Sequence, residues 1–376
     1  MYEFLARYSE WTANAQSDYC DFALGNPQSM PMPEFVSAIR EAAQPLSTDW
    51  FAYKMSEPNS REIVRDELVS WTSRPYACED IFLTNGATGA LMVTMNALLA
   101  ADDEVVFSNP SWFFYEGMIL NSGGTPVSVP ASEDFDLELS AIEAAISERT
   151  RLIIVNSPNN PTGKVYSAQT LSDLSQLLQR KSNQHGRPIY LISDEAYRRI
   201  VYDERPLISP ANLYRNSIMI YTYGKTLLTP GQRLGYLALS PEMDQRHEMR
   251  ELMLSSQILC GWAMCSALMQ HGLDQLGTLS LDVRELQSRR DHFVHELTNC
   301  GYDVRKPEGA FYITPETPTR DDAEFAEALA SEGVFCLPGQ IVGMPGRLRL
   351  SVAANDDMIE RAMPIFADVR RRFAGK

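Results

Sequence analysis

The feature that most constrains the fold of this chain is a regular alternation of short β-rich runs with helical stretches between about Trp50 and Leu239. The runs include EVVFS (104–108), LIIVNS (152–157), IYLISD (189–194), SIMIYTY (217–223) and RLGYLALS (233–240). Strand-like runs separated by helical segments are typical of βαβ units, whose strands form a mostly parallel sheet buried between helices. The pattern therefore predicts an α/β fold.

The clearest helical stretch, residues 167–181, lies between the second and third of these runs. Its leucines fall at i, i+3, i+6 and i+7, which places them on one face of a helix; they are Leu171, Leu174, Leu177 and Leu178. After Ser240 the pattern is helical through about Cys300. A shorter segment follows, with strand-like runs at 334–339 and 347–353 and a terminal helix expected from about Asp356.

These patterns divide the chain into two predicted domains. Residues 50–270 are expected to form a large domain, with a mostly parallel mixed sheet flanked by helices. Residues 271–376 are expected to form a smaller α+β domain, and residues 1–49 an N-terminal segment that joins it. No internal repeat or low-complexity tract contradicts this division.

Composition narrows the class of protein. Of the 376 residues, 44% are hydrophobic and 22% charged, which is typical of a globular chain. The net charge of −16 argues against nucleic acid and anionic membranes as partners, because both repel an acidic surface. No apolar run approaches the ~20 residues of a membrane helix, and the N-terminus lacks the features of a signal peptide. The six cysteines include no CxxC pair, which favours buried thiols in a reducing cytoplasm over disulfides or a metal site.

The polar clusters of the sequence lie where predicted strands end. LIIV runs into NSPNNPTG, IYLI into SDEAY, and SIMIYTY into GKT. In open α/β sheets, ligands bind beyond the carboxyl ends of the strands. We therefore expect the functional site at this edge of the sheet.

Common motifs for other chemistries are absent. The sequence has no GxGxxG, HExxH or GxSxG, and GKT at 224–226 is not a phosphate loop, because the required glycine is replaced by Met219. The histidines show no convincing metal-ligand spacing. The usual dinucleotide, zinc-protease and esterase interpretations are thereby excluded.

Three charged side chains stand near neighbouring strand ends. Lys225 follows the run at 217–223, and a lysine near the mouth of a buried site can lose its proton and form an imine. Asp194 ends the run before it; a partly buried carboxylate needs a cationic partner, which a protonated pyridine nitrogen would provide. Arg233 is a fixed cation suited to a phosphate.

Further residues fit the same chemistry. Asn160 supplies an amide, Tyr197 a phenol, and Trp112 a flat face for stacking. The segment TNGATGAL (84–91) has small residues that let the N–H groups of a helix start approach a phosphate. Together these groups describe a pyridoxal 5′-phosphate site. Structural roles remain alternatives: a surface position for Lys225, a helix cap for Asp194, a salt bridge for Arg233, and core packing for Trp112 and Tyr197.

The segments NSPNNPTG, SDEAY and GKTLLTPGQRLGY also resemble the signature segments of the class I/II aminotransferases, which are aspartate aminotransferase-like enzymes of pyridoxal-phosphate fold type I. The resemblance extends from FALGNP (22–27) to RLRLSVA (347–353), close to the whole chain. The lysine-to-arginine spacing K-x7-R with a following LGY is the most specific part.

The resemblance implies a role for each residue. Lys225 would bind the cofactor as an imine and shuttle a proton, Asp194 would pair with the pyridine nitrogen, and Asn160 and Tyr197 would bind the phenolic oxygen. The remaining cofactor contacts would come from Ala87, Thr88, Thr222 and Arg233 at the phosphate, and from Trp112 stacked on the ring. Arg349 would bind the substrate carboxylate beside Gly25, with Trp112 and Asn160 also near the substrate. Enzymes of this family are typically homodimers, and Tyr53 is the candidate contact to a neighbour's phosphate.

The sequence also departs from the family pattern. Gly224 replaces the usual serine before the lysine, Ile341 and Val342 stand where an aromatic residue is common, and Tyr53 lacks the glycine that usually follows it. Arg347 competes with Arg349 for the carboxylate, because the two share a face of one strand; the resemblance favours Arg349. Trp262 could line the pocket, although core packing is the simpler interpretation.

The expected reaction is transamination between an α-amino acid, aspartate or another common one, and a 2-oxo acid such as 2-oxoglutarate. A lyase, decarboxylase or cyclising synthase would use the same cofactor, because the protein selects the broken bond only by its orientation over the ring. A binding protein or regulator without catalysis is the third alternative. The intact Lys225 argues against the former, and the acidic charge argues against a DNA-binding regulator.

Overall fold

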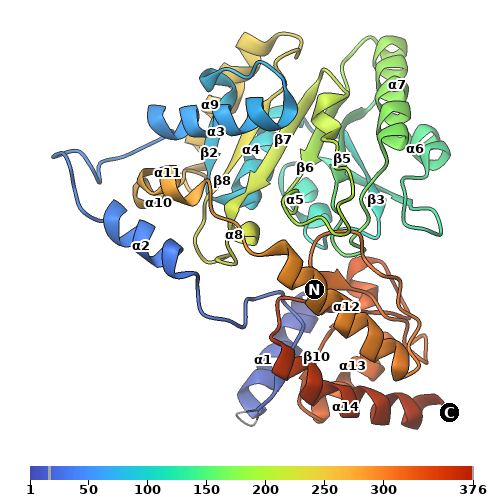
Figure 1. The fold of residues 1–376 in the computed structure, drawn as a ribbon. Coiled ribbons are helices and arrows are strands. Elements are labelled where there is room, and N and C mark those ends of the chain that lie inside the picture. The colour runs from blue at the N-terminus through green and yellow to red at the C-terminus, as the bar shows by residue number, and fades with distance from the viewer. Residues whose placement is uncertain (16–17, 375–376) are drawn as a thin grey trace.

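The computed structural model describes residues 1–15 and 18–374. Within these residues a seven-stranded sheet forms the centre of the fold, in the order β2-β8-β7-β6-β5-β3-β4 (Figure 1). Its strands are β2 (Ile81–Thr84), β3 (Glu104–Asn109), β4 (Thr125–Pro130), β5 (Thr150–Asn156), β6 (Tyr190–Asp194), β7 (Ser217–Thr222) and β8 (Gly235–Leu239). β8 runs antiparallel to both its neighbours, whereas the other pairs are parallel. The predicted mostly parallel mixed sheet is confirmed.

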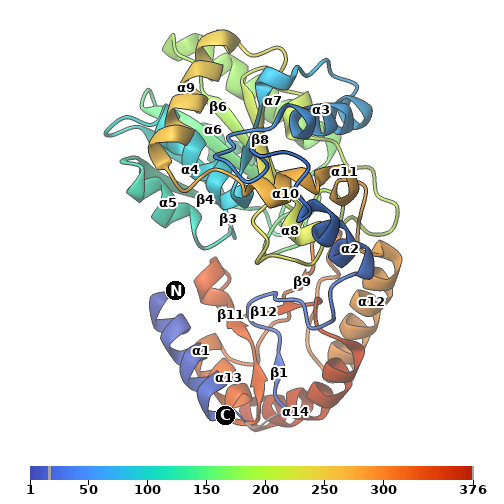
Figure 2. The ribbon, with the colours of Figure 1, turned by 90° about the vertical axis from the view of Figure 1, so that its left-hand side faces the viewer.

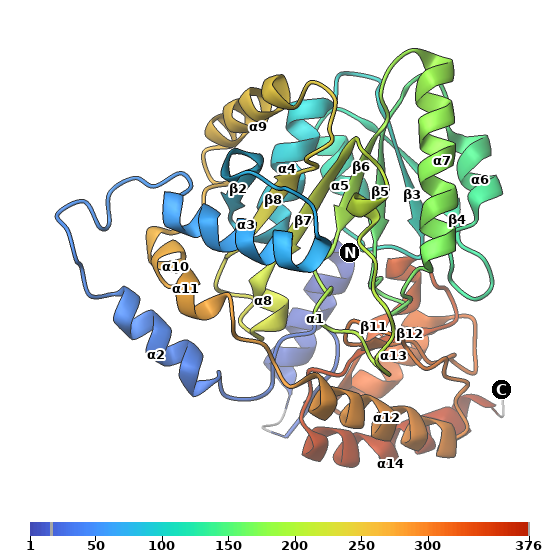
Figure 3. The same cartoon turned by 45° about the horizontal axis from the view of Figure 1, so that its top comes forward.

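Helices cover both faces of this sheet, so that the upper part of the molecule has three layers (Figure 3). Ile154 and Ile192 pack with α4 (Gly86–Leu98), α5 (Tyr115–Asn121) and α9 (Arg246–Cys260). Ile153 and Leu191, one position away, pack with α6 (Leu139–Ala145) and α7 (Ala168–His185) on the other face. Successive strand residues point to opposite faces, so the strands are apolar throughout because both faces are buried.

The helix predicted over 167–181 is α7. The Ser167 hydroxyl caps it by accepting from the Thr170 amide at 3.0 Å, and Gly186 ends it with φ +66°. The predicted leucine face is confirmed, since Leu171, Leu174, Leu177 and Leu178 are all buried.

The remaining layer over β2, β8 and β7 comes from α3 (Pro58–Thr72), α10 (Ala267–His271) and α11 (Leu273–Leu276), against which α2 (Pro33–Ala42) also packs. The short helix α8 (Tyr223–Thr226) follows β7 directly. Short 3₁₀ turns occur at Cys78–Asp80, Pro210–Asn212 and Gly339–Val342.

A second, smaller layered unit follows the sheet and lies below it in Figure 2. It contains a three-stranded sheet in the order β11-β12-β9 and a strand pair β1-β10. The strands are β1 (Cys20–Asp21), β9 (Tyr312–Ile313), β10 (Val334–Phe335), β11 (Leu337–Pro338) and β12 (Leu348–Ser351), and the helices are α12 (Val283–Asn299), α13 (Asp322–Ser331) and α14 (Asp356–Ala374). α1 (Tyr2–Asn14) packs here as well, and β1 pairs in parallel with β10. The domain boundaries at 49/50 and 270/271 stay a prediction.

Two further features bear on the predictions from composition. All six cysteines are free thiols. Among the helices of residues 1–15 and 18–374, none is long and apolar enough to cross a membrane.

Candidate active site

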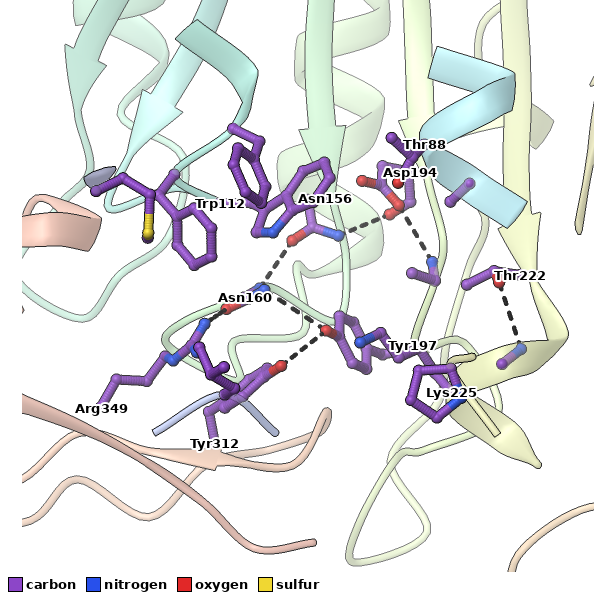
Figure 4. Close-up of a pocket in the computed structure, with 18 of the residues that line it drawn as sticks. Thr88, Trp112, Asn156, Asn160, Asp194, Tyr197, Thr222, Lys225, Tyr312 and Arg349 are labelled. Atoms are coloured by element: carbon purple, nitrogen blue, oxygen red, sulfur yellow. Dashed lines mark hydrogen bonds between the residues drawn. The ribbon is translucent and has the colours of Figure 1, made fainter. Parts of the chain in front are cut away.

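A cavity of about 350 Å³ lies at the carboxyl ends of the central strands, where the sequence placed the site. Figure 4 shows the side chains that line it. The predicted residues that line it are Ala87, Thr88, Trp112, Asn160, Asp194, Tyr197, Thr222, Lys225, Arg233 and Arg349. Gly25 adjoins it through its neighbour Leu24, whereas Tyr53 lies outside it with its side chain fully exposed. Trp262 does not line the cavity, so the prediction that it could line the pocket is wrong. Its side chain is also half exposed, so it does not pack in the core either.

Lys225 is presented by the single turn of α8. Thr222 ends β7 and caps this turn, its hydroxyl accepting from the Gly224 amide at 3.3 Å. The Lys225 Nζ lies 5.8 Å from the centre of the Tyr197 ring and 5.6 Å from that of Phe311. The amine therefore projects into the cavity between aromatic faces, at the end of a rigid strand.

Asp194 is the last residue of β6 and is buried. One carboxylate oxygen accepts from the Tyr115 hydroxyl, and the other accepts from the Ala196 amide at 3.3 Å. Burial raises the pKa of Asp194, and the hydrogen bonds and the charge of Lys225 only partly oppose this effect. Asp194 is thus a carboxylate that lines the cavity and forms no salt bridge within residues 1–15 and 18–374.

The Asn156 side chain ties two strand ends together. Its amide donates to the Asp194 carbonyl at 2.9 Å, and its oxygen accepts from the Asn160 backbone amide at 2.7 Å. Asn156 thus holds the backbone of Asp194 and that of Asn160 next to each other, at the edge of the sheet where both side chains line the cavity (Figure 4).

The start of α4 and Arg233 could together hold an anion. Ala87 and Thr88 lie in the first turn of this helix, where backbone N–H groups are unpaired and the helix dipole is positive. Arg233 donates to the carbonyls of Pro230 at 2.7 Å and Asn85 at 3.4 Å. Within the described residues no carboxylate pairs with it, and burial lowers its pKa. A half-buried, uncompensated cation beside a helix start favours a phosphate.

Glycine is required where this cradle is tightest. A Cβ atom on Gly86 would lie 2.6 Å from the Arg233 guanidinium, and the Gly86 φ of +73° is disfavoured for other residues. Gly86 therefore lets the start of α4 pack closely against Arg233; the predicted approach of this helix start to a phosphate stays a prediction.

Arg349 lies on β12 with only 2% of its surface exposed. It donates to the Ala23 carbonyl at 2.9 Å and to the Asn160 side-chain oxygen at 3.2 Å, and it stacks 4.3 Å from the centre of the Tyr312 ring. Its Nε has no partner within residues 1–15 and 18–374. A buried guanidinium with an unused N–H group is suited to bind a carboxylate.

Arg347 is used differently. It donates to the Thr314 carbonyl at 2.9 Å and pairs with Glu316, and it does not line the cavity. The structure thus separates the two arginines that strand alternation could not.

Tyr312 is the main polar side chain of the cavity that the sequence did not indicate. Its hydroxyl lies 3.3 Å from that of Tyr197, which accepts from the Asn160 amide at 3.5 Å (Figure 4). Burial raises the pKa of Tyr312, but the charges of Lys225 and Arg349 outweigh this effect and lower it. Tyr312 therefore connects the amine end of the cavity to the arginine end.

Gly25 makes room for this tyrosine. Its φ is +70°, and a Cβ atom there would lie 2.9 Å from the Tyr312 hydroxyl.

Other residues at the cavity that the sequence did not indicate are Asn156, Tyr115, Phe113, Leu24, Leu5 and Met1. Asn156 ends a predicted strand and so carried a signal, whereas Tyr115 and the apolar residues carried none, because nothing local distinguishes them from core.

Comparisons with known proteins agree with this geometry. Residues 18–365 match the family model of class I and II aminotransferases. The chain is 30% identical to a probable aspartate aminotransferase of Methanocaldococcus jannaschii, with 94% of both chains covered. It is 31% identical to a probable aspartate/prephenate aminotransferase of Aquifex aeolicus, with 91% and 88% covered.

Solved structures show the same fold. An aminotransferase from Eubacterium rectale superposes with a TM-score of 0.92 at 29% identity, with 99% of this chain and 95% of that chain covered. An aspartate aminotransferase from Thermotoga maritima superposes with a TM-score of 0.84 at 26% identity, with 97% and 95% covered.

Proposed function

The chain belongs to the class I and II aminotransferases, and from this premise we propose that it uses pyridoxal 5′-phosphate to move an amino group between an α-amino acid and a 2-oxo acid. Aspartate or another common amino acid, with an acceptor such as 2-oxoglutarate, is the expected pair; relatives are named aspartate or aspartate/prephenate aminotransferases. The observation that carries this proposal is the Lys225 amine, which shares one cavity with Asp194 and Arg233. In the part of the chain that the structure describes, neither of these two charged side chains forms a salt bridge.

The residues present fit this cofactor. Asp194 would hold the protonated pyridine nitrogen, which supplies the cation that the buried carboxylate lacks. The phosphate would be held by Ala87, Thr88, Thr222 and Arg233, the phenolic oxygen by Asn160 and Tyr197, and the ring by the face of Trp112. When bound, the cofactor supplies an aldehyde for amine capture and a ring that withdraws electrons from the substrate Cα.

The chain's own groups would then orient the substrate and move its proton. Arg349 would hold the α-carboxylate, which places the substrate Cα between Arg349 and Lys225. Lys225 Nζ would hold the cofactor covalently and, once released, would take the proton from Cα and return it. The Tyr197 and Tyr312 hydroxyls lie between the two ends and would orient the substrate without leaving a buried donor unpaired.

Arg349→Lys should weaken substrates through their carboxylate, because an ammonium cannot reproduce the planar fork of a guanidinium. We expect kcat/KM for an amino acid to fall by ~10²-fold, on the ~1.5–3 kcal/mol scale of a charged hydrogen bond. Kinetics on the amino acid and on the matching amine without a carboxylate measure the effect. The amine should be barely affected, and equal losses on both would assign Arg349 a structural role. Arg347→Lys is the matched control.

We also propose that the chain is a homodimer. Large apolar side chains are exposed on the loop between α2 and α3 and at the end of α9; they are Leu46, Phe51, Tyr53, Leu259 and Trp262. The loop between α2 and α3, and the helix α9, lie on the face turned to the viewer in Figure 2. Exposed apolar groups gathered on one face are typical of a protein interface.

The six free thiols support a reducing, cytoplasmic location.

Tyr53→Ala should lower cofactor affinity by about tenfold or more, because a hydrogen bond to the partner's phosphate is lost. Subunit mixing tests whether this contact crosses the interface. A heterodimer of Tyr53→Ala and Lys225→Ala has one site with both Lys225 and a tyrosine from the other subunit. Mixed dimers should therefore recover cofactor affinity and activity at half of their sites. Unchanged affinity, no recovery, or a monomer in sedimentation would contradict the prediction for Tyr53.

The experiment that tests the function mixes purified holoenzyme with single amino acids. We expect the cofactor absorbance to change, the matching 2-oxo acid to appear, and an added 2-oxo acid to restore the first spectrum. Release of ammonia, carbon dioxide or a cyclised product without such restoration would replace transamination with lyase, decarboxylase or synthase chemistry. No spectral change with any amino acid would leave a binding protein.

A further inference from the structure

The cavity has no further positively charged side chain, among the described residues, that could bind a second carboxylate of the substrate. Within the part of the chain that the structure describes, the cations lining it are Lys225, Arg233 and Arg349. Each already has a partner in the proposed function: the aldehyde, the phosphate and the α-carboxylate. A distal carboxylate such as that of aspartate would be buried with no cation of this chain facing it, which is unfavourable.

Most of the polar side chains next to Arg349 already form hydrogen bonds within the protein. Asn160 bonds to Arg349 and Tyr197, and Tyr197 contacts Tyr312. Asn156 bonds to two backbone groups at the strand ends. These contacts leave the substrate side chain with few polar partners in the cavity.

The rest of the wall near Arg349 is apolar. Met1, Leu5 of α1, Leu24 and Phe113 all line the cavity; these four residues are called the apolar wall below. Each is partly buried, and each packs against the cluster around Phe335, which holds it in place. An apolar ligand that covers such exposed apolar side chains removes them from water, which favours its binding.

The position of the apolar wall relates it to the substrate side chain. The Phe113 ring centre lies 5.6 Å from the Arg349 guanidinium. Leu24 follows Ala23, whose carbonyl accepts from Arg349 at 2.9 Å. A substrate held by its carboxylate at Arg349 therefore has its side chain beside this wall, and not beside the anion site at Arg233.

We infer that the preferred amino donor is an α-amino acid with a large apolar side chain, such as leucine, methionine or phenylalanine. This side chain would pack against the apolar wall. This inference rests on the proposed function and narrows its substrate class. The expected discrimination against aspartate in kcat/KM is about 10²-fold, the range that an apolar pocket provides.

The first test compares amino acids on the wild-type holoenzyme. We expect leucine, methionine and phenylalanine to convert the cofactor spectrum fastest, alanine more slowly, and aspartate and glutamate slowest. If aspartate or glutamate reacts fastest, the inference is overturned while the aminotransferase proposal stands; a cation from the partner subunit would produce this result. If no amino acid converts the cofactor, the proposed function itself fails.

The second test changes the wall. Leu5→Arg places a cation where the substrate side chain should lie, and should shift the ratio of aspartate to leucine kcat/KM by at least about tenfold. Ala6→Arg is the matched control, since Ala6 is the next residue of α1, is exposed and does not line the cavity. Leu5→Ala, a milder change, should slow leucine and phenylalanine but not alanine. Equal effects of Leu5→Arg and Ala6→Arg on this ratio, or an unchanged preference in Leu5→Ala, would overturn the inference.

Discussion

Replacing Lys225 with Ala should abolish turnover. Loss of a positioned proton-transfer group alone costs ~10²–10⁴-fold, and loss of the covalent link to the cofactor adds to it. The fold should survive, because the helical turn of α8 is capped by Thr222 and the Lys225 amine forms no salt bridge within the described chain. Single-turnover rates with an amino acid measure the loss, and thermal melting checks the fold.

Borohydride reduction followed by peptide mapping identifies the lysine directly. A phosphopyridoxyl adduct is expected on Lys225 in the wild-type protein and on no residue in Lys225→Ala. Lys306→Ala is a suitable control, since Lys306 is half exposed, pairs with Asp291 and does not line the cavity. It should retain both adduct and turnover. An adduct on any other lysine would contradict the assignment.

Asp194→Asn should lower kcat/KM by about 10- to 150-fold, corresponding to the ~1.5–3 kcal/mol of a hydrogen bond to a charged group. The amide keeps the size of the side chain but loses the charge that holds the pyridine nitrogen protonated. Folding should be little affected, because burial already disfavours the charged form of Asp194. Steady-state kinetics and melting without cofactor separate these two effects.

Tyr115→Phe provides the comparison for this variant. It removes the hydroxyl that donates to Asp194 but leaves the carboxylate in place. The loss in kcat/KM should therefore be smaller than for Asp194→Asn. If Asp194→Asn turns over near the wild-type rate, Asp194 is only a cap or core carboxylate.

Much of the central sheet could be predicted from local pattern. The runs at 104–108, 152–157, 189–194 and 217–223 all lie in strands, because short apolar runs rich in β-branched residues, with helices before and after them, fit a sheet buried on both faces. The strands β2, which has only four residues, and β4 were not predicted. β4 begins TP and ends in Pro130, which weakens its strand signal, and it lies at the edge of the sheet.

The residues at the proposed cofactor end of the cavity could also be predicted from the sequence. Asn160, Asp194 and Lys225 each lie at or soon after the carboxyl end of a strand, and parallel neighbouring strands bring such ends together. Their proximity follows from local position plus one rule of sheet geometry. The roles assigned to them stay predictions until the variants above are measured.

The substrate end depended on the tertiary structure. The Arg349 guanidinium, the Tyr312 ring and the Ala23 carbonyl meet there from β12, β9 and the segment after β1. Strand alternation places Arg347 and Arg349 on the same face, and only the packing around them buries one and pairs the other with Glu316.

Periodicity and strand termini are local properties, so the amino-acid sequence was enough to predict the layered α/β fold, the edge of the sheet where the cavity lies and the polar residues at its strand ends. The tertiary structure decided which arginine faces the cavity, that Tyr312 connects its two ends, and that Leu5 of α1 lines it. These contacts join segments hundreds of residues apart, and their partners are selected by the packing of whole elements, which no local pattern records.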